Sequence, residues 1–412
     1  MARALITALD VGTSATQTVV AERIFEGDGD RLRVLGVGIV PSAGVRKGVV
    51  VDLDDAADVI RRSADEASRS AGVAIKSVWA AVGGARVSVA SSRGVVAVSR
   101  ADGEITREDQ RRAIAAAETF LPRNPNRDTL HVIAREFRVD QEEGVRDPVG
   151  MHGVRLEVDA LIIEIFAPAL KNFLKCIESA GLRVTDYVFG PLAAAEAVLS
   201  KRQKELGVML VDLGGGTGSF IVYEEGAPLH AGVLPFGGNH ITNDIAIGFR
   251  THVDVAEQVK LAYGSCMSED LGKRDGIRAA EFVPDHPGVY SRRELAQIIQ
   301  ARLGDVFELI QKELKRINRK ELLPSGVVLV GGGAGLSGLC DLARREIGLP
   351  VELGVPSGFE GLDLEYSRTL STALGVVAWA SNHGADRAPG WESNFSQFRQ
   401  TAWFRWLRSL LP

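Results

Sequence analysis

The stretches LDVGTSATQTVV at residues 9–20 and VMLVDLGGGTGSFIVYEEG at residues 208–226 decide the fold. In each of them an apolar run ends in an aspartate, Asp10 or Asp212, and a glycine turn leads into a second extended run. One such unit alone is equally well explained as an ordinary β-hairpin, because glycine accepts turn conformations that other residues avoid. Two copies in one chain predict an α/β protein of two related halves, with a phosphate group between their turns.

The turns themselves supply the candidate phosphate ligands. Glycine lets backbone N–H groups approach a phosphate closely, and hydroxyl side chains add further donors. Asp10 and Asp212 are candidate ligands of a hydrated Mg²⁺, since that ion keeps most of its waters and takes one or two carboxylates. The predicted phosphate-binding residues are Gly12, Thr13 and Ser14 in the first turn and Gly214, Gly215, Gly216 and Thr217 in the second.

A third glycine-rich turn, formed by Gly331, Gly332 and Gly333, follows the apolar run at residues 327–330 and precedes a helix predicted from about residue 338. Taken alone it is a weak dinucleotide-binding signal, and no acidic residue stands in the right setting to bind a ribose. In a chain with a duplicated hairpin it is better interpreted as the turn that packs on adenosine.

Bulk properties narrow the class of protein. A chain of 412 residues suits two or three domains, and a net charge of −5 provides no overall field that attracts nucleic acid. Three cysteines far apart in sequence fit a reducing cytosol, and the histidines show no zinc-site spacing. The N-terminus does not have the pattern of a signal peptide, and no stretch reaches the roughly 20 apolar residues that span a bilayer. Any membrane contact is therefore expected to be peripheral.

Residues 85–158 differ in character from their surroundings. Short alternating strands are predicted, for example at 87–90 and 95–98, and a helix is predicted at 106–120. Thr106 with Asp109 is a capping arrangement for the start of that helix. A charged stretch with several glycines follows at 135–153. This pattern predicts a small inserted α+β subdomain.

The three glycine turns together resemble the actin superfamily, in which two RNase H-like lobes clamp ATP and Mg²⁺ in a cleft. Within that superfamily the chain is similar to the FtsA family of bacterial cell-division proteins, over about residues 5–383 and in its C-terminal segment. The most recognisable stretch is EFRVDQEEGVRDPVGMHGVRLEVD at 136–159. It is supported by ITREDQRRAIAAAE at 105–118, LHVIAREF at 130–137 and LPFGGNHITNDIAIGFRTHVDVAEQVKLAYG at 234–264.

This resemblance implies an actin-like, two-lobed α/β fold built on a duplicated RNase H-like core, with an inserted α+β subdomain of the 1C type and a C-terminal amphipathic helix. The expected division is lobe 1A at residues 1–84, 160–204 and 362–383, subdomain 1C at 85–159, lobe 2A at 205–250 and 325–361, subdomain 2B at 251–324, a linker at 384–392 and a membrane-targeting helix at 393–412.

The resemblance also implies ATP and Mg²⁺ as ligands, with Glu257 and Lys260 near the adenosine. The alternative for that pair is a solvated helix face with charges three residues apart. The sequence departs from the family at Ala15, where a lysine is usual, and at Gly218-Ser219 in the second turn. Gly190 precedes Pro191, where related chaperone ATPases have a glutamate near the attacking water. We therefore expect a nucleotide-binding switch with slow or no ATP hydrolysis, and no catalytic residue is assigned.

The end of the chain, SNFSQFRQTAWFRWLRSLLP at 393–412, predicts a helix that lies in a membrane interface. At helical spacing most of its large apolar side chains share one broad face, and it contains arginines but no acidic residue. The alternative is a helix that packs on its own protein or on a partner. In the FtsA family this helix is the membrane anchor. The predicted membrane-contacting residues are Phe395, Phe398, Trp403, Trp406, Leu407, Leu410, Arg405 and Arg408.

The resemblance implies partners as well as ligands. They are the C-terminal tail of FtsZ, further copies of the chain in a filament, anionic membrane lipids and other proteins of the division machinery, at the cytoplasmic face of the inner membrane at the septum. Arg302, Arg292 and Arg293 are candidates to pair with acidic residues of the FtsZ tail. Scattered charges on an exposed helix face explain each arginine at least as well.

The sequence leaves three other interpretations open. A pilus-assembly ATP-binding protein shares the inserted subdomain but is not expected to carry the amphipathic C-terminal segment. A sugar kinase requires a catalytic aspartate for a hydroxyl substrate and a different insertion. A shape-determining actin homologue has a different sequence in place of residues 136–159.

Overall fold

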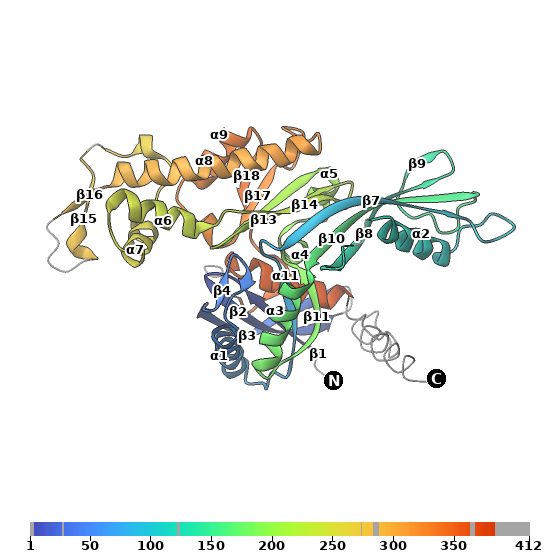
Figure 1. Cartoon of the computed structure of the whole chain (residues 1–412), viewed down its shortest axis with the longest axis horizontal. Coiled ribbons are helices and arrows are strands. Elements are labelled where there is room, and N and C mark those ends of the chain that lie inside the picture. The colour runs from blue at the N-terminus through green and yellow to red at the C-terminus, as the bar shows by residue number, and fades with distance from the viewer. Residues whose placement is uncertain are drawn as a thin grey trace.

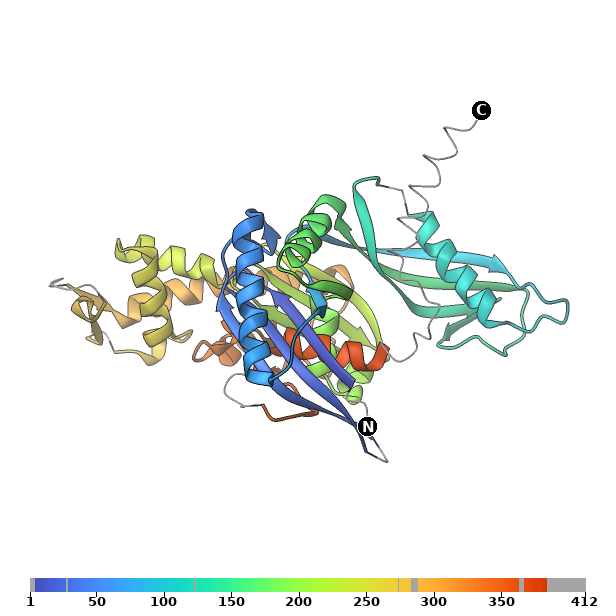
Figure 2. The ribbon, with the colours of Figure 1, turned by 90° about the horizontal axis from the view of Figure 1, so that it is seen from below.

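The computed structural model describes residues 4–26, 29–121, 124–272, 274–282, 288–362 and 367–383. Two lobes, each built on a β-sheet, form the body. A helical region, made of α6 (Gly238–Phe249), α7 (Val253–Tyr263) and the start of α8 (Arg292–Arg316), and an inserted sheet extend from the body in opposite directions (Figures 1 and 2). Mixed sheets with helices on their faces confirm the predicted α/β, actin-like architecture. The residue boundaries of the subdomains remain predictions.

The first lobe is organised around a six-stranded sheet. Its first two strands form the predicted antiparallel hairpin, in which Asp10 pairs with Gln17. Successive residues of the first strand face opposite sides. Leu9 packs with α1 (Leu53–Ala71) and α3 (Ala167–Ser179), while Ala8 packs with α4 (Gly190–Val198) and α11 (Ser371–His383). In spatial order the strands are β11 (Arg183–Phe189), β6 (Ser77–Val82), β1 (Ala4–Val11), β2 (Ala15–Glu26), β3 (Gly29–Pro41) and β19 (Phe359–Glu360).

The second lobe repeats this arrangement in a five-stranded sheet. Its hairpin places Asp212 opposite Ser219, and a parallel strand follows on the other side of the Asp212 strand, as β6 does beside β1. The predicted duplication of the hairpin is therefore present in the fold. In spatial order the strands are β14 (Ala227–Leu234), β13 (Gly218–Glu224), β12 (Val208–Leu213), β17 (Val327–Val330) and β18 (Val351–Leu353).

Two helices, α4 (Gly190–Val198) and α11 (Ser371–His383), lie between the two sheets and join them in one hydrophobic core. They pack directly against each other, and a Cβ atom added to Gly375 of α11 would lie 2.7 Å from the backbone nitrogen of Ala194 in α4. The outer face of the first sheet is covered by α1 (Leu53–Ala71) and α3 (Ala167–Ser179), and that of the second by α6 (Gly238–Phe249), α8 (Arg292–Arg316) and α9 (Leu339–Ile347).

The inserted region forms a separate four-stranded sheet, with α2 (Arg107–Phe120) on one face. Thr106 and Asp109 form the predicted capping box at the start of α2. The predicted pair of short strands is wrong, because the chain forms one strand, β7 (Val87–Ala97). The strand β10 (Arg155–Phe166) pairs with it along its whole length, and Gly94 lets α2 approach closely. In spatial order the strands are β7 (Val87–Ala97), β10 (Arg155–Phe166), β8 (Arg127–Val139) and β9 (Glu142–Val145).

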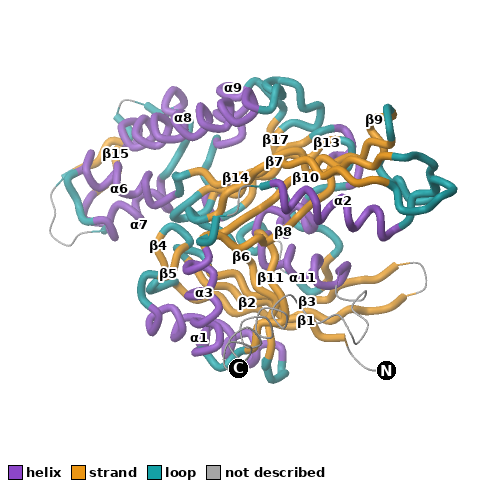
Figure 3. The backbone as a smooth tube through the Cα atoms, turned by 45° about the vertical axis from the view of Figure 1, so that its right-hand side comes forward, coloured by secondary structure: helices purple, strands orange, loops and turns teal. Residues whose placement is uncertain are grey.

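The remaining elements are short. Figure 3 shows α7 (Val253–Tyr263) beside α6, and β4 (Val45–Arg46) and β5 (Val49–Val50) beside the first lobe. The helices are α5 (Lys201–Leu206) and α7 (Val253–Tyr263), with 3₁₀ turns η1 (Ser268–Asp270), η2 (Ala279–Glu281) and η3 (Gly332–Gly335). The strands pair as β4 (Val45–Arg46) with β5 (Val49–Val50) and β15 (Gly276–Arg278) with β16 (Val289–Ser291).

The predicted linker at 384–392 and membrane helix at 393–412 lie outside the described residues. Across the residues that are described, no helix is both long enough and apolar enough to cross a membrane.

Candidate functional site

A cavity of about 470 Å³ opens between the two lobes, at the ends of β1 and β12. All the residues predicted to bind phosphate, adenosine or Mg²⁺ line this one cavity, although they come from distant parts of the chain. They are Asp10, Gly12, Thr13, Ser14, Asp212, Gly214, Gly215, Gly216, Thr217, Glu257, Lys260, Gly331, Gly332 and Gly333.

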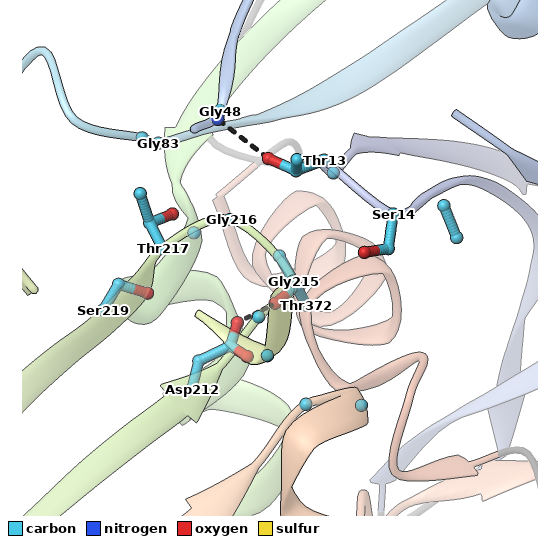
Figure 4. A pocket seen from close by; sticks show the side chains of 18 of the residues that line it. Thr13, Ser14, Gly48, Gly83, Asp212, Gly215, Gly216, Thr217, Ser219 and Thr372 are labelled. Atoms are coloured by element: carbon cyan, nitrogen blue, oxygen red, sulfur yellow. Dashed lines mark hydrogen bonds between the residues drawn. The ribbon is translucent and has the colours of Figure 1, made fainter. Parts of the chain in front are cut away.

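The first turn joins β1 to β2 and is closed by its own backbone. The N–H of Gly12 donates to the carbonyl of Ala15 at 3.0 Å, and a Cβ on Gly12 would lie 2.8 Å from that oxygen. The hydroxyl of Thr13 accepts a hydrogen bond of 3.0 Å from the N–H of Gly48, as Figure 4 shows. Gly48 belongs to the short turn between β4 and β5, so this hairpin supports the turn from the side.

The second turn, between β12 and β13, touches the first turn across the cavity. A Cβ on Gly216 would lie 2.5 Å from the Thr13 hydroxyl, so only glycine fits this approach. The hydroxyl of Ser14 donates to the side-chain oxygen of Asn239 at 3.4 Å, which adds a second bridge between the lobes. The two turns therefore face each other, and their backbone and hydroxyl groups enclose the space between them (Figure 4).

Asp10 and Asp212 stand at the mirrored ends of β1 and β12. Burial, followed by the nearby Asp212 carboxylate, raises the pKa of Asp10 to about 7. Burial also raises the pKa of Asp212, against a hydrogen bond of 3.1 Å from the Thr372 hydroxyl that lowers it. Two buried carboxylates that repel each other form a site where a bound cation would stabilise their charged forms. In the described residues no three acidic, histidine or cysteine side chains gather into a metal cluster, so protein groups alone supply few ligands.

The third turn lies directly against Asp212, because a Cβ added to Gly331 would collide with the Asp212 carboxylate. Gly331 has a φ of 86°, a conformation that other residues rarely adopt. A Cβ at that position would also lie 2.9 Å from the carbonyl of Leu213. The chain then forms η3 before α9 begins at Leu339, close to the predicted start of the helix.

Glu257 and Lys260 form a compact network on α7. The ammonium group of Lys260 lies 2.7 Å from the Glu257 carboxylate and 2.8 Å from the hydroxyl of Thr242, and Lys260 is only 8% exposed. Thr242 also donates to Glu257 at 2.5 Å. The pair is therefore a partly buried part of the cavity wall, which argues against a solvated helix face.

Several residues of the site carry no signal in the sequence that would have identified them. Gly48, Gly83 and Gly84 lie in ordinary-looking turns, and Thr372 lies in an apolar helix. They reach the cavity only because β4 and β6 end there and α11 begins there. Gly190 and Pro191 line the cavity, and no carboxylate stands at that position.

The three arginines proposed for partner binding all lie on α8, but they differ in their contacts with other residues of the chain. Arg302 makes a two-pronged ion pair with Asp244 of α6, at 2.5 and 2.9 Å, and a second pair with Asp305. The guanidinium of Arg292 stacks over the ring of Tyr263 at 5.7 Å. Arg293 is half-buried.

Comparisons with known proteins agree with this architecture. The family model "Cell division protein FtsA" matches residues 209–375, and the model "SHS2 domain inserted in FTSA" matches residues 84–164. The chain is 36% identical to the cell division protein FtsA of Pseudomonas aeruginosa, over 93% of this chain and 90% of that protein. It is 35% identical to FtsA of Bacillus subtilis, over 91% of this chain and 83% of that protein.

Solved structures show the same fold at low sequence identity. A PilM–PilN type IV pilus biogenesis complex aligns with a TM-score of 0.66 and 18% identity, over 91% of this chain and 97% of that chain. MreB5 of Spiroplasma citri bound to ADP aligns with a TM-score of 0.51 and 14% identity, over 92% of this chain and 96% of that chain. These likenesses concern the fold alone, whereas the sequence matches extend over nearly the whole chain. On those matches, the chain belongs to the FtsA family of cell division proteins.

Proposed function

We propose that this chain binds ATP with Mg²⁺ in the cavity between its lobes and tethers FtsZ to the cytoplasmic face of the inner membrane at the division septum. The observation that carries the nucleotide part is the pair of aspartate-ended strands whose glycine turns face each other across one cavity. The membrane and FtsZ parts rest on the family and on the sequence.

The residues present fit a nucleoside triphosphate. Glycine turns from both lobes offer backbone N–H groups, and Thr13, Ser14 and Thr217 offer hydroxyls, as a phosphate chain requires. The Glu257 and Lys260 network and the third turn form the opposite part of the wall, where we place the adenosine. Solved structures of MreB5 with ADP and with AMPPNP share the fold, which supports a nucleotide here.

Mg²⁺ would neutralise charge between the triphosphate and the two aspartates. Asp10 and Asp212 would hold it mostly through its waters, since two carboxylates suit that ion. Gly190 precedes Pro191, so that position has no carboxylate or glutamine side chain to orient an attacking water. We therefore propose a switch with slow hydrolysis. A steady-state turnover of ATP comparable to that of the chaperone ATPases or the sugar kinases would contradict this.

The nucleotide proposal is tested by titrating the purified chain with a fluorescent ATP analogue in the presence of Mg²⁺. Saturable binding that unlabelled ATP displaces is expected, and Asp212→Asn should weaken it by about tenfold or more, since a charged contact is worth roughly 1.5–3 kcal/mol. Asp341→Asn is the matched control, because Asp341 is exposed on α9 outside the cavity. Failure of the unaltered chain to bind would refute the proposal.

Membrane attachment is proposed through residues 393–412. One amphipathic helix of this size gives reversible adsorption, and self-association would array many helices and multiply the avidity. A chain that ends before residue 393 should bind nucleotide normally but no longer sediment with anionic liposomes. Sedimentation equal to that of the full chain would count against the anchor. Crosslinking on liposomes with and without ATP tests filament formation.

Docking of the FtsZ tail is proposed at the helical region around α8, where Arg292, Arg293 and Arg302 lie. Because Arg302 already pairs with Asp244, loss of binding in Arg302→Glu is ambiguous. The exchange Arg302→Asp with Asp244→Arg allows the internal ion pair to re-form with its charges reversed. If Arg302 contacts the tail, the exchanged chain should bind an FtsZ tail peptide more weakly than the unaltered chain. Full binding would remove Arg302 from the interface. Contacts with other division proteins belong to the same proposal.

A further inference from the structure

The charges on the cavity wall are unevenly partnered. Among the described residues that line it, Asp10, Asp212 and Glu257 are acidic, and Lys260 and Arg86 are basic. Lys260 is already neutralised by Glu257 at 2.7 Å and is almost fully buried. For Arg86, no carboxylate within the described ranges lies at ion-pair distance, and the side chain is exposed. Among the described residues of the wall, Arg86 is therefore the cation that remains available to an anionic ligand.

The backbone holds Arg86 close to the first phosphate turn. Arg86 follows Gly83 and Gly84, and a Cβ added to Gly48 would lie 2.6 Å from the Cα of Gly84. Gly48 in turn donates to the Thr13 hydroxyl. Figure 4 shows Gly48 and Gly83 beside Thr13, on the side of the pocket where the two turns meet. Arg86 thus belongs to the phosphate side of the cavity.

Within the described part of the chain, the side chain of Arg86 is held by a weak contact with an aromatic ring. Its guanidinium lies 5.7 Å from the centre of the Phe166 ring, and its backbone carbonyl accepts a hydrogen bond of 3.1 Å from the N–H of Phe166. An exposed cation–π contact is weak, so the flexible stem can exchange the ring for a stronger acceptor. A phosphate is such an acceptor, because its oxygens match the planar fork of a guanidinium.

We propose that Arg86 binds the terminal phosphate of a nucleoside triphosphate in this cavity. The inference rests on the proposed nucleotide function and deepens it. Without Arg86, the wall would offer a triphosphate three carboxylates and a single, already paired ammonium group. Arg86 stands directly before β7 and contacts the end of β10, the two strands that connect the inserted sheet to the first lobe. The same contact would therefore distinguish a triphosphate from a diphosphate at the root of the inserted sheet.

The test compares two nucleotides in the full chain with Mg²⁺ present. Calorimetric titration of Arg86→Gln should give an affinity for AMPPNP about tenfold lower than that of the unaltered chain, and an affinity for ADP within about twofold. Arg86→Lys, which keeps the charge but loses the fork, should fall between them. Arg107→Gln is the matched control, because Arg107 is exposed at the start of α2 and lies outside the cavity.

The possible failures are distinguishable. An unaltered chain that binds neither nucleotide would overturn the proposed function and this inference with it. In a second case the unaltered chain binds both nucleotides, but Arg86→Gln changes the affinities for AMPPNP and ADP by the same factor or changes neither. That result would overturn only the role of Arg86. Circular dichroism and the unfolding temperature of each variant establish that the chain is folded in every comparison.

Discussion

Acidification is expected to destabilise this protein through His131, a residue of β8 where the inserted sheet meets the first lobe. Its Nε2 atom accepts a hydrogen bond of 3.0 Å from the backbone N–H of Phe189, so that nitrogen must be unprotonated. The ring meets Trp379 edge-on at 5.7 Å, and Trp379 stacks on His383. Burial, and then the charge of His383, lower the pKa of His131 from 6.5 to about 4.

The size of the effect follows from that shift. In the unfolded chain His131 takes up a proton at a pH near 6.5, whereas in the folded chain it does so only near 4. Protons therefore favour the unfolded state between these two values. The contribution of unprotonated His131 to the free energy of unfolding is fully present above about pH 6.5. It decreases as the pH falls toward 4 and changes no further below that. At about 1.4 kcal/mol for each pKa unit, the loss is about 3 kcal/mol.

The assay is urea unfolding of the unaltered chain and of His131→Gln at several pH values from about 8 to 4. Glutamine keeps an oxygen that can accept the Phe189 N–H but does not titrate. Carboxylates titrate in both proteins, so their effect cancels in the difference of the two unfolding free energies. As the pH is lowered over this range, the unfolding free energy of the unaltered chain should fall by about 3 kcal/mol more than that of His131→Gln. A difference that stays constant over this range would refute the reasoning.

Three further substitutions test other parts of the fold. Gly375→Ala places a methyl group 2.7 Å from the backbone nitrogen of Ala194, so urea unfolding should show a loss of about 3 kcal/mol or more, and an unchanged midpoint would contradict the tight helix crossing. Asp52→Ala removes the side chain that caps α1 through two backbone N–H groups, and should cost about 1 kcal/mol in the same assay. Thr372→Val removes the hydrogen bond to Asp212, and should weaken Mg²⁺-dependent ATP binding several-fold in calorimetry, whereas equal affinity would assign Thr372 to packing alone.

The sequence was informative where the determinants of structure are local. Each hairpin is encoded within a few neighbouring residues, and the cap at Thr106 depends on a partner three positions away, so both were predicted. β7 was predicted as two pieces because its middle is polar, and only pairing with β10 makes it continuous. The fold class and the family came from the order of these units and from the resemblance in residues 136–159.

The parts of the site that were missed are contributed across the fold. Gly48, Arg86 and Thr372 come from three separate segments, and none belongs to a motif that marks a phosphate site. Ion pairs between distant residues cannot be predicted from the sequence either. Arg302 has no obvious partner in the sequence, and only the packing of α6 places Asp244 beside it. Local patterns identify which turns can hold a phosphate, but long-range packing decides which charges remain available to it.

The distribution of close contacts indicates where the molecule can move. Between the sheets, α4 and α11 pack backbone to backbone at Gly375 and share one core with both lobes, so that region resists rearrangement. The contact between the two turns, as far as the described residues show it, is made by glycine, by the small side chains of Thr13 and Ser14, and by the hydrogen bond from Ser14 to Asn239. A ligand that separates the turns therefore loses little packing there, while the helices act as the pivot. We accordingly expect nucleotide to change the angle between the lobes and to leave the core around α11 intact.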